Sequence, residues 1–139
     1  MNASTQTYVL DASAAVDYID SGPGAPQIEL KLADGLRQQR PLLMSVVNLG
    51  EVFYLSWQRS GEEKARQTVA RLSRLPLLMV PVDLPQALKA SELKAIHKLP
   101  YVDAIAAALA LQHRATLVTA DRDFEKLGRH FSVMWLPRR

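Results

Sequence analysis

Short apolar segments alternate along the chain with longer segments of helical character, and this alternation restricts the possible folds. In residues 7–10 (TYVL), 77–80 (LLMV) and 115–119 (ATLVT), apolar residues follow one another directly. A strand with one face in water alternates polar and apolar residues, whereas a strand that is apolar throughout is covered on both faces. The pattern therefore predicts an α/β fold in which helices cover both faces of a parallel sheet.

The expected elements follow one another without a repeat or a linker. The segments expected to form strands are residues 7–10, 42–44, 77–80, 115–119 and 132–136. The segments expected to form helices are residues 12–19, 27–39, 46–60, 62–75, 85–98, 100–114 and 122–127. Asp11 or Ser13 is placed to cap the first helix, while Ser45 caps the third and Gly61 ends it. Ligands bind beyond the carboxyl ends of parallel strands, so residues that follow a strand are candidates for a functional site.

Length and composition favour a single domain without a membrane span. The chain has 139 residues, and we expect one domain over residues 1–139, with frayed tails at 1–6 and 137–139. Hydrophobic residues make up 48% of the chain, which is enough for a core. No apolar run approaches the roughly 20 residues of a membrane helix. The N-terminal segment lacks the basic residues of a signal peptide, so we expect a cytoplasmic protein.

Charge and cysteine content narrow the function classes. The absence of cysteine excludes disulfides and thiolate metal sites. The formal net charge of +3 is weak evidence for a nucleic-acid partner, because ordinary solvation of the surface also explains it. A group of basic residues surrounds one expected helix, and a solvated helix face explains it somewhat better than a dedicated RNA groove. These residues are Arg59, Lys64, Arg66, Arg71 and Arg74.

Acidic residues interrupt or end several apolar segments. They are Asp11, Glu51, Asp103, Asp121 and Asp123. A carboxylate that is buried without a partner costs free energy, so a fold that gathers these side chains needs a cation. Asp11 directly follows the first expected strand, and Asp121 and Asp123 follow the fourth in the segment TADRDF. Both acids of that turn can reach one pocket.

Two of the acids lie on expected helices. Glu51 lies on the apolar side of its helix, and Asn48, one turn earlier, is placed to hold it as a supporting residue. Asp103 lies in the first turn of a helix that is apolar all round (AIAAALAL) and is therefore expected to be central. Ordinary structural roles also exist, because Asp11 and Asp121 can cap helices and Asp103 suits the helix dipole.

The acids come from four separated segments, and this convergence is stronger evidence than any single position. Thr119 adds a hydroxyl group at the end of the fourth expected strand. Carboxylate oxygens in a chain without cysteine favour Mg²⁺ or Mn²⁺. A pair of such ions about 4 Å apart can activate water and orient a phosphate. The sequence therefore predicts a divalent-metal site that acts on phosphate.

Other catalytic motifs are absent from the sequence. Neither GxxxxGK[ST] nor GxGxxG occurs, which argues against P-loop and Rossmann nucleotide binding. His97, His113 and His130 lack the spacing of metal ligands and are interpreted as surface or helix-end residues. The GxSxG motif is missing and Ser13 has no histidine partner by pattern, so a serine hydrolase is not indicated.

Four segments resemble, in order, the motifs of the PIN domain family. They are YVLDASAAVDYI, SVVNLGEVFY, LPYVDAIAAALA and LVTADRDFEKL, and the resemblance extends from Tyr8 to about Trp135. More narrowly, the chain resembles the VapC-type toxins of bacterial toxin–antitoxin pairs. The resemblance implies a three-layer α/β/α sandwich with a five-stranded parallel sheet. It also implies an endoribonuclease activity that depends on Mg²⁺ or Mn²⁺.

The resemblance further implies residue roles and partners. It assigns catalytic and metal-binding roles to Asp11, Glu51, Asp103 and Asp121. Asp123 is similar to an additional metal-binding acid of the family, and Ser13 and Thr119 match supporting hydroxyl positions beside the site. The implied partners are an RNA substrate (a transfer RNA or a ribosomal RNA loop), a VapB-like antitoxin that wraps the toxin, and a second copy of the chain in a homodimer.

Two other hypotheses remain open. In the first, the acids form a non-catalytic pocket that docks a basic protein partner, and binding of Mn²⁺ would separate this from a nuclease. In the second, the chain is a phosphatase of the haloacid dehalogenase type, which also places an aspartate after its first strand. That class needs a second aspartate two residues further on, where this chain has Ser13.

Overall fold

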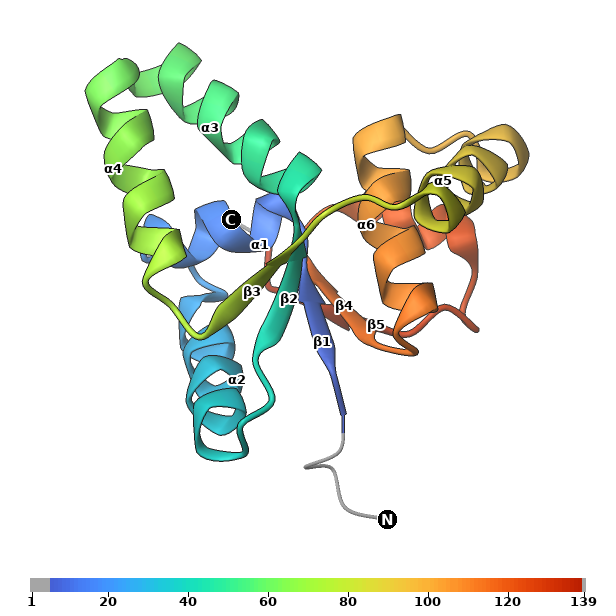
Figure 1. Cartoon of the computed structure of the whole chain (residues 1–139), viewed down its shortest axis with the longest axis horizontal. Helices are drawn as coiled ribbons and strands as arrows, with labels where there is room; N and C mark the ends of the chain where they lie inside the picture. Colours follow the sequence, from blue (N-terminus) through green and yellow to red (C-terminus); the bar gives the residue numbers. More distant parts are fainter. Residues whose placement is uncertain (1–5, 139) are drawn as a thin grey trace.

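The computed structural model describes residues 6–138, in which a parallel sheet lies between two layers of helices (Figure 1). The strands are β1 (Tyr8–Leu10), β2 (Leu42–Ser45), β3 (Leu77–Val80), β4 (Thr116–Thr119) and β5 (Val133–Trp135). They lie in the order β3-β2-β1-β4-β5, and every pairing is parallel. The predicted three-layer α/β/α sandwich with a five-stranded sheet is confirmed.

The helices occupy the predicted segments to within a few residues. They are α1 (Ala12–Ile19), α2 (Ala25–Arg37), α3 (Val46–Ser60), α4 (Glu62–Ser73), α5 (Leu84–His97), α6 (Tyr101–Gln112) and the 3-10 helix η2 (Arg122–Leu127). Ser45 caps α3 by accepting a hydrogen bond from the N–H of Val47, as predicted. Gly61 separates α3 from α4 with a φ of 91°, a conformation that glycine adopts without steric cost.

Several boundaries differ from the prediction. Helix α2 begins at Ala25, two residues before the expected start, and α4 ends at Ser73, two residues before the expected end. Helix α5 begins one residue early because Asp83, which was not predicted to be a cap, accepts a hydrogen bond from the N–H of Gln86. Strand β3 has the predicted bounds, β1, β2 and β4 differ from the prediction by one residue at one end, and β5 is one residue shorter at each end. Such end residues depend on local capping that periodicity does not show.

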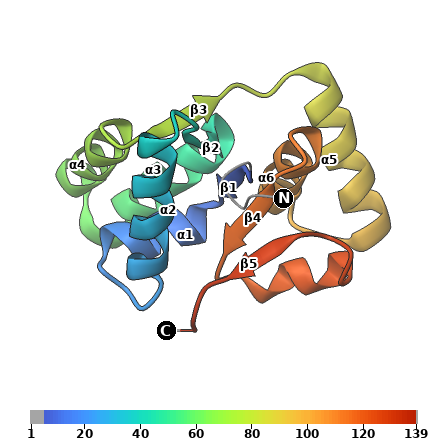
Figure 2. The same cartoon turned by 90° about the horizontal axis from the view of Figure 1, so that it is seen from below.

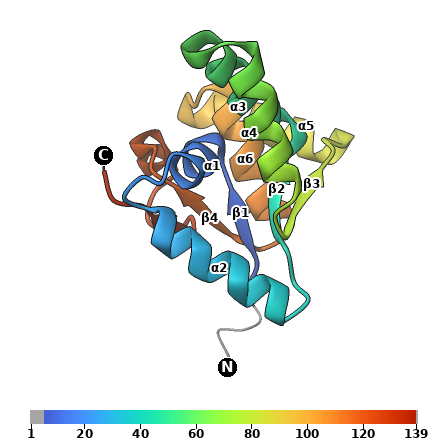
Figure 3. The ribbon, with the colours of Figure 1, turned by 90° about the vertical axis from the view of Figure 1, so that its left-hand side faces the viewer.

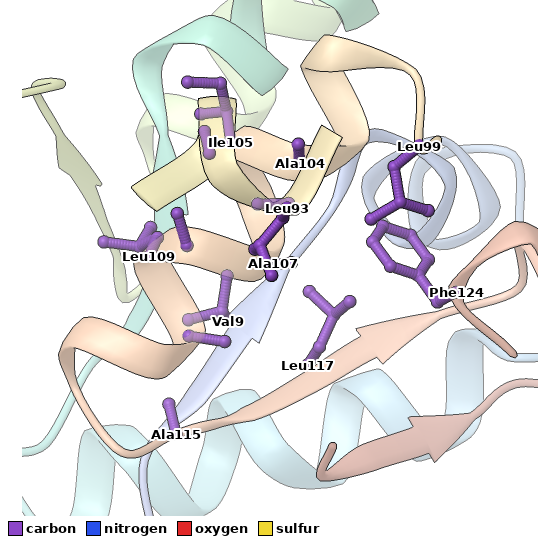
Figure 4. Packing of buried hydrophobic residues seen from close by; sticks show 14 of the residues in the cluster. Val9, Leu93, Leu99, Ala104, Ile105, Ala107, Leu109, Ala115, Leu117 and Phe124 are labelled. Carbon is purple, nitrogen blue, oxygen red and sulfur yellow. The ribbon is translucent and has the colours of Figure 1, made fainter. Parts of the chain in front are cut away.

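Alternate residues of each strand point to opposite faces of the sheet and fill two separate cores. On one face, Val9 and Leu117 pack beneath α5 and α6, together with Phe124 (Figure 4). On the other face, Leu10 and Met44 pack beneath α1 and α2. Figure 2 shows these two helical layers on opposite sides of the strands, and Figure 3, seen from the second layer, shows α1, α2 and α4 in front of the sheet.

The direction in which strands are added reverses next to β1. Strands β2 and β3 extend the sheet on one side of β1, while β4 and β5 extend it on the other. Strands β1 and β4 therefore become neighbours, with Leu10 opposite Val118, although they are far apart in the sequence. A reversal of this kind leaves a crevice beyond the carboxyl ends of the two strands, where α/β sheets bind their ligands. Asp11 and Thr119 lie at this crevice.

The predictions of frayed chain ends and of no membrane span can be compared with the described residues. Residues 1–5 and 139 of the expected tails lie outside the described residues, whereas the side chain of Gln6 donates a hydrogen bond of 2.9 Å to the hydroxyl of Thr116. Between Gln6 and Arg138, no helix has both the length and the apolar character that a membrane crossing requires.

Candidate metal centre

A cleft of about 310 Å³ opens at the carboxyl edge of the sheet, between α1, α3 and the start of α6. Its lining contains carboxylates from four separated segments, and no lysine or arginine lines it within residues 6–138. The acidic lining residues are Asp11, Asp17, Glu51, Asp103 and Asp121. The sequence predicted that five distant acids converge on one cavity. Four of them, Asp11, Glu51, Asp103 and Asp121, line the cleft, and Asp123 lies beside the cleft.

Asp11 is fixed by hydrogen bonds to both of its carboxylate oxygens. Its Oδ1 accepts from the backbone N–H of Ala14 at 2.8 Å and from the hydroxyl of Ser13 at 2.8 Å, while Oδ2 accepts from the hydroxyl of Thr119. Asp11 is only 3% exposed. Because a carboxylate oxygen has two lone pairs, Oδ2 retains a position for a further ligand.

Asp11 is also the N-cap of α1, through its hydrogen bond from Ala14. The alternative in which Ser13 caps the helix and leaves Asp11 without a structural role is wrong. The hydroxyl of Ser13 instead donates to Asp11 and accepts from the N–H of Ala120 at 3.1 Å. Ser13 therefore ties α1 to the end of β4, and the capping role and the cleft position of Asp11 coexist.

Thr119 connects two of the acids. Its hydroxyl donates to Asp11 and accepts from the backbone N–H of Asp121 at 2.9 Å. Asp121 in turn accepts from the N–H of Asp123 at 2.9 Å, which makes it the N-cap of η2. The turn after β4 is therefore shaped by side-chain hydrogen bonds that fix the backbone of both of its acids beside the cleft.

Three carboxylates come close enough to share one ion. One oxygen from each of Asp103, Asp121 and Asp123 lies within 4.8 Å of the other two. Oxygens on opposite sides of an octahedrally coordinated Mg²⁺ are roughly 4 Å apart, so small side-chain movements suffice for all three to reach the same ion. These residues fit a hard divalent cation. Asp11 and Glu51 do not belong to this group of three, although both line the same cleft.

Glu51 and Asn48 project from α3, as their spacing predicted. Glu51 is half-buried and lines the cleft. Asn48 is 1% exposed, and its amide donates a hydrogen bond of 3.2 Å to the carbonyl of Val102, at the start of α6. Asn48 therefore connects α3 to the turn that carries Asp103. Burial raises the pKa of Glu51, the side chain of Asn48 opposes this rise, and the charge of Asp121 adds to it.

The electrostatics of the cleft favour the binding of a cation. Burial raises the pKa of Asp11 to about 6, although the hydrogen bonds from Thr119 and other donors act against this rise. Burial is also the largest cause of the raised pKa of Asp103, and the nearby charges of Asp121 and Asp11 raise it further. A group whose charged form is disfavoured in this way gains stability when a cation enters the cleft.

One cleft residue was not identified from the sequence. Asp17 is 1% exposed, and its Oδ2 accepts a hydrogen bond of 2.7 Å from the N–H of Gly24. It therefore holds the turn between α1 and α2 while it lines the cleft. The signal was present, since Asp17 interrupts an otherwise apolar helix one turn after Ser13 and thus faces the same side.

Comparison with protein families identifies a match over most of the chain. The model of the PIN domain family matches residues 8–130. No curated protein sequence matches the chain. The family match covers the strand and helix ends that supply all five predicted acids.

Solved structures of low sequence identity share this fold. VapBC2 of Rickettsia felis, bound to a DNA fragment from its promoter, has a TM-score of 0.75 at 18% identity, and the match covers 95% of this chain and 100% of that one. DNA-bound VapBC of Salmonella typhimurium has a TM-score of 0.72 at 18% identity, with 94% and 98% covered. VapC20 of Mycobacterium tuberculosis, a toxin that cleaves the sarcin–ricin loop, has a TM-score of 0.66 at 20% identity, with 87% and 95% covered.

Proposed function

The chain belongs to the PIN domain family, and on this premise we propose that it is an endoribonuclease that cleaves RNA phosphodiester bonds with Mg²⁺ or Mn²⁺. The observation that carries the proposal is the gathering of five carboxylates from four segments around one cleft, whose lining includes no basic residue among residues 6–138. Carboxylates held together in this way repel one another and the phosphates of RNA unless a cation is bound. A nuclease has a use for such a site, whereas a purely structural core does not.

The roles of the residues follow from their positions. Asp103, Asp121 and Asp123 would hold a cation, because their oxygens are close enough to share it. Asp11 and Glu51 would complete the acidic lining of the cleft. A bound Mg²⁺ or Mn²⁺ would supply the Lewis acid that makes water nucleophilic at neutral pH and neutralises charge on the phosphate. No histidine base is then required.

The remaining residues keep this arrangement rigid. Thr119 and Ser13 fix the carboxylate of Asp11 through their hydroxyls, and Asn48 anchors the start of α6 next to Asp103. Neighbours of this kind set the orientation of metal ligands and strongly affect metal affinity. We therefore assign Ser13, Asn48 and Thr119 positioning roles.

We further propose that the protein is the toxin of a VapBC-type toxin–antitoxin pair and acts in the cytoplasm. The support is the similarity of its fold to VapBC structures from Rickettsia felis and Salmonella typhimurium and to VapC20, which cleaves the sarcin–ricin loop. A VapB-like antitoxin would bind the toxin and a homodimer would form. A structured RNA, either a transfer RNA or a ribosomal RNA loop, would be the substrate.

The test is cleavage of total cellular RNA by the purified protein, with Mg²⁺ or Mn²⁺ and with chelator, followed by mapping of new 5′ ends. We expect cleavage at defined positions that chelator abolishes. Asp121→Asn, which removes one charge at nearly constant size, should lower the rate by at least about a hundredfold.

Glu125→Gln is the matched control, because Glu125 is an exposed acid on η2, the helix that Asp121 caps, and lies outside the cleft lining. It should cut at the wild-type rate. Equal rates for the wild type and a folded Asp121→Asn variant would refute the proposed site. A protein that neither binds Mn²⁺ nor cleaves any RNA would instead favour a docking pocket for a basic partner.

A further inference from the structure

A second pocket, of about 200 Å³, is lined by residues of α1, α3 and α4. Figure 1 shows the arrangement of these three helices on the same side of the molecule. The end of α1 forms one side of the pocket and the last turns of α3 form another. The inward-facing side of α4 closes the third. The lining residues are Ile19, Asp20, Ser56, Arg59, Ser60, Lys64, Gln67, Thr68 and Arg71.

This basic pocket carries an excess of positive charge. Arg59, Lys64 and Arg71 line it, and Asp20 is its one acidic lining residue among those described. Asp20 forms an ion pair of 3.0 Å with Arg59. No carboxylate within residues 6–138 lies at ion-pair distance from Lys64 or Arg71. Two positive charges therefore remain for an anionic ligand.

The structure divides the basic cluster that surrounds α4 in the sequence. Lys64 and Arg71 face the basic pocket, whereas Arg66 pairs with Glu62 at 2.9 Å and lies over the ring of Phe53. Arg74, at the end of α4, also lies outside the pocket lining. The sequence interpretation treated this cluster as one solvated helix face. The structure instead separates Lys64 and Arg71, which line the basic pocket, from Arg66 and Arg74, which do not.

The basic pocket continues the wall of the acidic cleft. On α3, Glu51 and Leu55 line the cleft, and Ser56 and Arg59 line the basic pocket. Glu51 and Arg59 are about two helical turns apart, which corresponds to a distance of about 12 Å along the axis of α3. Helix α1 likewise contributes its start to the cleft and its end to the basic pocket. A polyanion that enters the acidic cleft therefore meets cations a short distance along the same two helices.

We propose, on the basis of the nuclease function proposed above, that the basic pocket binds a backbone phosphate of the RNA strand, displaced from the phosphate that is cleaved. Arginine and lysine supply charge and hydrogen bonds to phosphate oxygens, and hydroxyl and amide groups add further donors. The pocket offers both kinds, since Ser56, Ser60, Thr68 and Gln67 lie beside its basic residues. This interaction offsets the repulsion between the acidic cleft and the strand and positions the strand for cleavage.

The test compares two double variants with the same change in charge on the same helix. Lys64→Gln with Arg71→Gln alters the basic pocket, and Arg66→Gln with Arg74→Gln is the matched control. Binding of a fluorescent single-stranded RNA oligonucleotide is measured by anisotropy in chelator, over a series of salt concentrations. Lys64→Arg with Arg71→Lys keeps both charges and should restore binding.

We expect the pocket variant to bind RNA at least about tenfold more weakly than the control variant. In the pocket variant the slope of log K against log salt should fall by roughly 0.7, because the protein then neutralises one phosphate fewer, and the control should keep the wild-type slope. In cleavage assays with metal, KM should rise in the pocket variant while kcat stays close to that of the wild type.

The proposal that the basic pocket binds RNA would be refuted if the two double variants had equal RNA affinities and equal salt slopes. It would also be refuted if the wild type bound no RNA. A pocket variant that keeps RNA binding but loses binding of an oligoglutamate peptide would also overturn it, in favour of an acidic protein segment. The two proposals remain distinguishable. If the wild type cleaves no RNA but the pocket variant loses RNA binding, only the proposed nuclease function is refuted. If both variants cleave RNA at the wild-type rate, only the proposed phosphate-binding role of the basic pocket is refuted.

Discussion

Asp11 combines a structural and an electrostatic role in one side chain. It caps α1, and it accepts a hydrogen bond from Thr119, which is 108 residues away in the sequence. The position after a strand was sufficient to predict the first role and to propose the second. The hydrogen bond with Thr119 could not be predicted, because it depends on which strand lies next to β1. Asp17 did carry a signal, its place one turn after Ser13 on α1, but the prediction did not use it.

The pH dependence of stability tests the electrostatic strain at Asp11. Its pKa in the folded protein is about 6, above the ordinary value of 3.8. The folded state therefore binds more protons than the unfolded state between these values, and stability falls as the pH rises from 3.8 through 6. A difference of this size corresponds to roughly 3 kcal/mol. Metal-free protein should accordingly melt at a higher temperature at about pH 5 than at about pH 7.5, as measured by circular dichroism in chelator.

Asp11→Asn provides the control for this prediction. The substitution removes the titrating group, so the difference in melting temperature between the two pH values should become smaller. Saturating Mn²⁺ should raise the melting temperature of the wild type at the higher pH. The electrostatic account of Asp11 fails if the variant shows the full pH dependence of the wild type.

At the scale of elements, α6 is the helix that gives the site its rigidity. It is buried from Asp103 to Ala110, and most of its buried residues are alanines. Small side chains let the helix approach the sheet closely, and Asn48 ties its start to α3. The uniformly apolar sequence of this helix predicted its central position. The capping of α5 by Asp83 escaped prediction because it depends on a single hydrogen bond and not on periodicity. The early start of α2 escaped prediction because no side chain caps this helix and its first turn contains Pro26, a residue that suits a turn and a helix start alike.

Enlarging one alanine of α6 should therefore disturb both packing and the site. Ala107 is fully buried against the sheet (Figure 4), and Ala107→Leu should lower the free energy of unfolding by about 1–3 kcal/mol. It should also weaken Mn²⁺ binding, because Asp103 lies one turn earlier. Urea denaturation and calorimetry measure the two effects.

Ala95→Leu is a suitable comparison, since Ala95 is exposed on α5. This change should alter stability by less than about 0.5 kcal/mol. If Ala107→Leu were as stable as Ala95→Leu, α6 would not be packed as closely against the sheet as described.

At the scale of the whole molecule, the order of the strands brings the acidic residues of distant segments to one cleft. The reversal at β1 places the ends of β1 and β4 side by side, and α3 and α6 each add an acid to the same crevice. Periodicity predicted how many strands and helices exist and that the sheet is parallel. It could not predict the strand order, because pairing between distant segments leaves no local signal. The expectation of a common site came from acids at strand ends and on apolar helix faces in four segments, and the resemblance to the PIN domain motifs added residue roles to it.

The molecule also separates its charges. The acidic cleft and the basic pocket share the walls α1 and α3, although the net charge of the whole chain is only +3. The net charge therefore gave no sign of either feature, whereas the arrangement of the helices places the acidic cleft and the basic pocket next to each other.

The most direct test of the central claim is the location of manganese in crystals soaked with Mn²⁺, by anomalous scattering. The account predicts a peak in the acidic cleft, roughly 2 Å from carboxylate oxygens of Asp103 and Asp121, and its loss in crystals of Asp103→Asn. Manganese found only outside the cleft, in crystals of a protein that cleaves RNA, would contradict it.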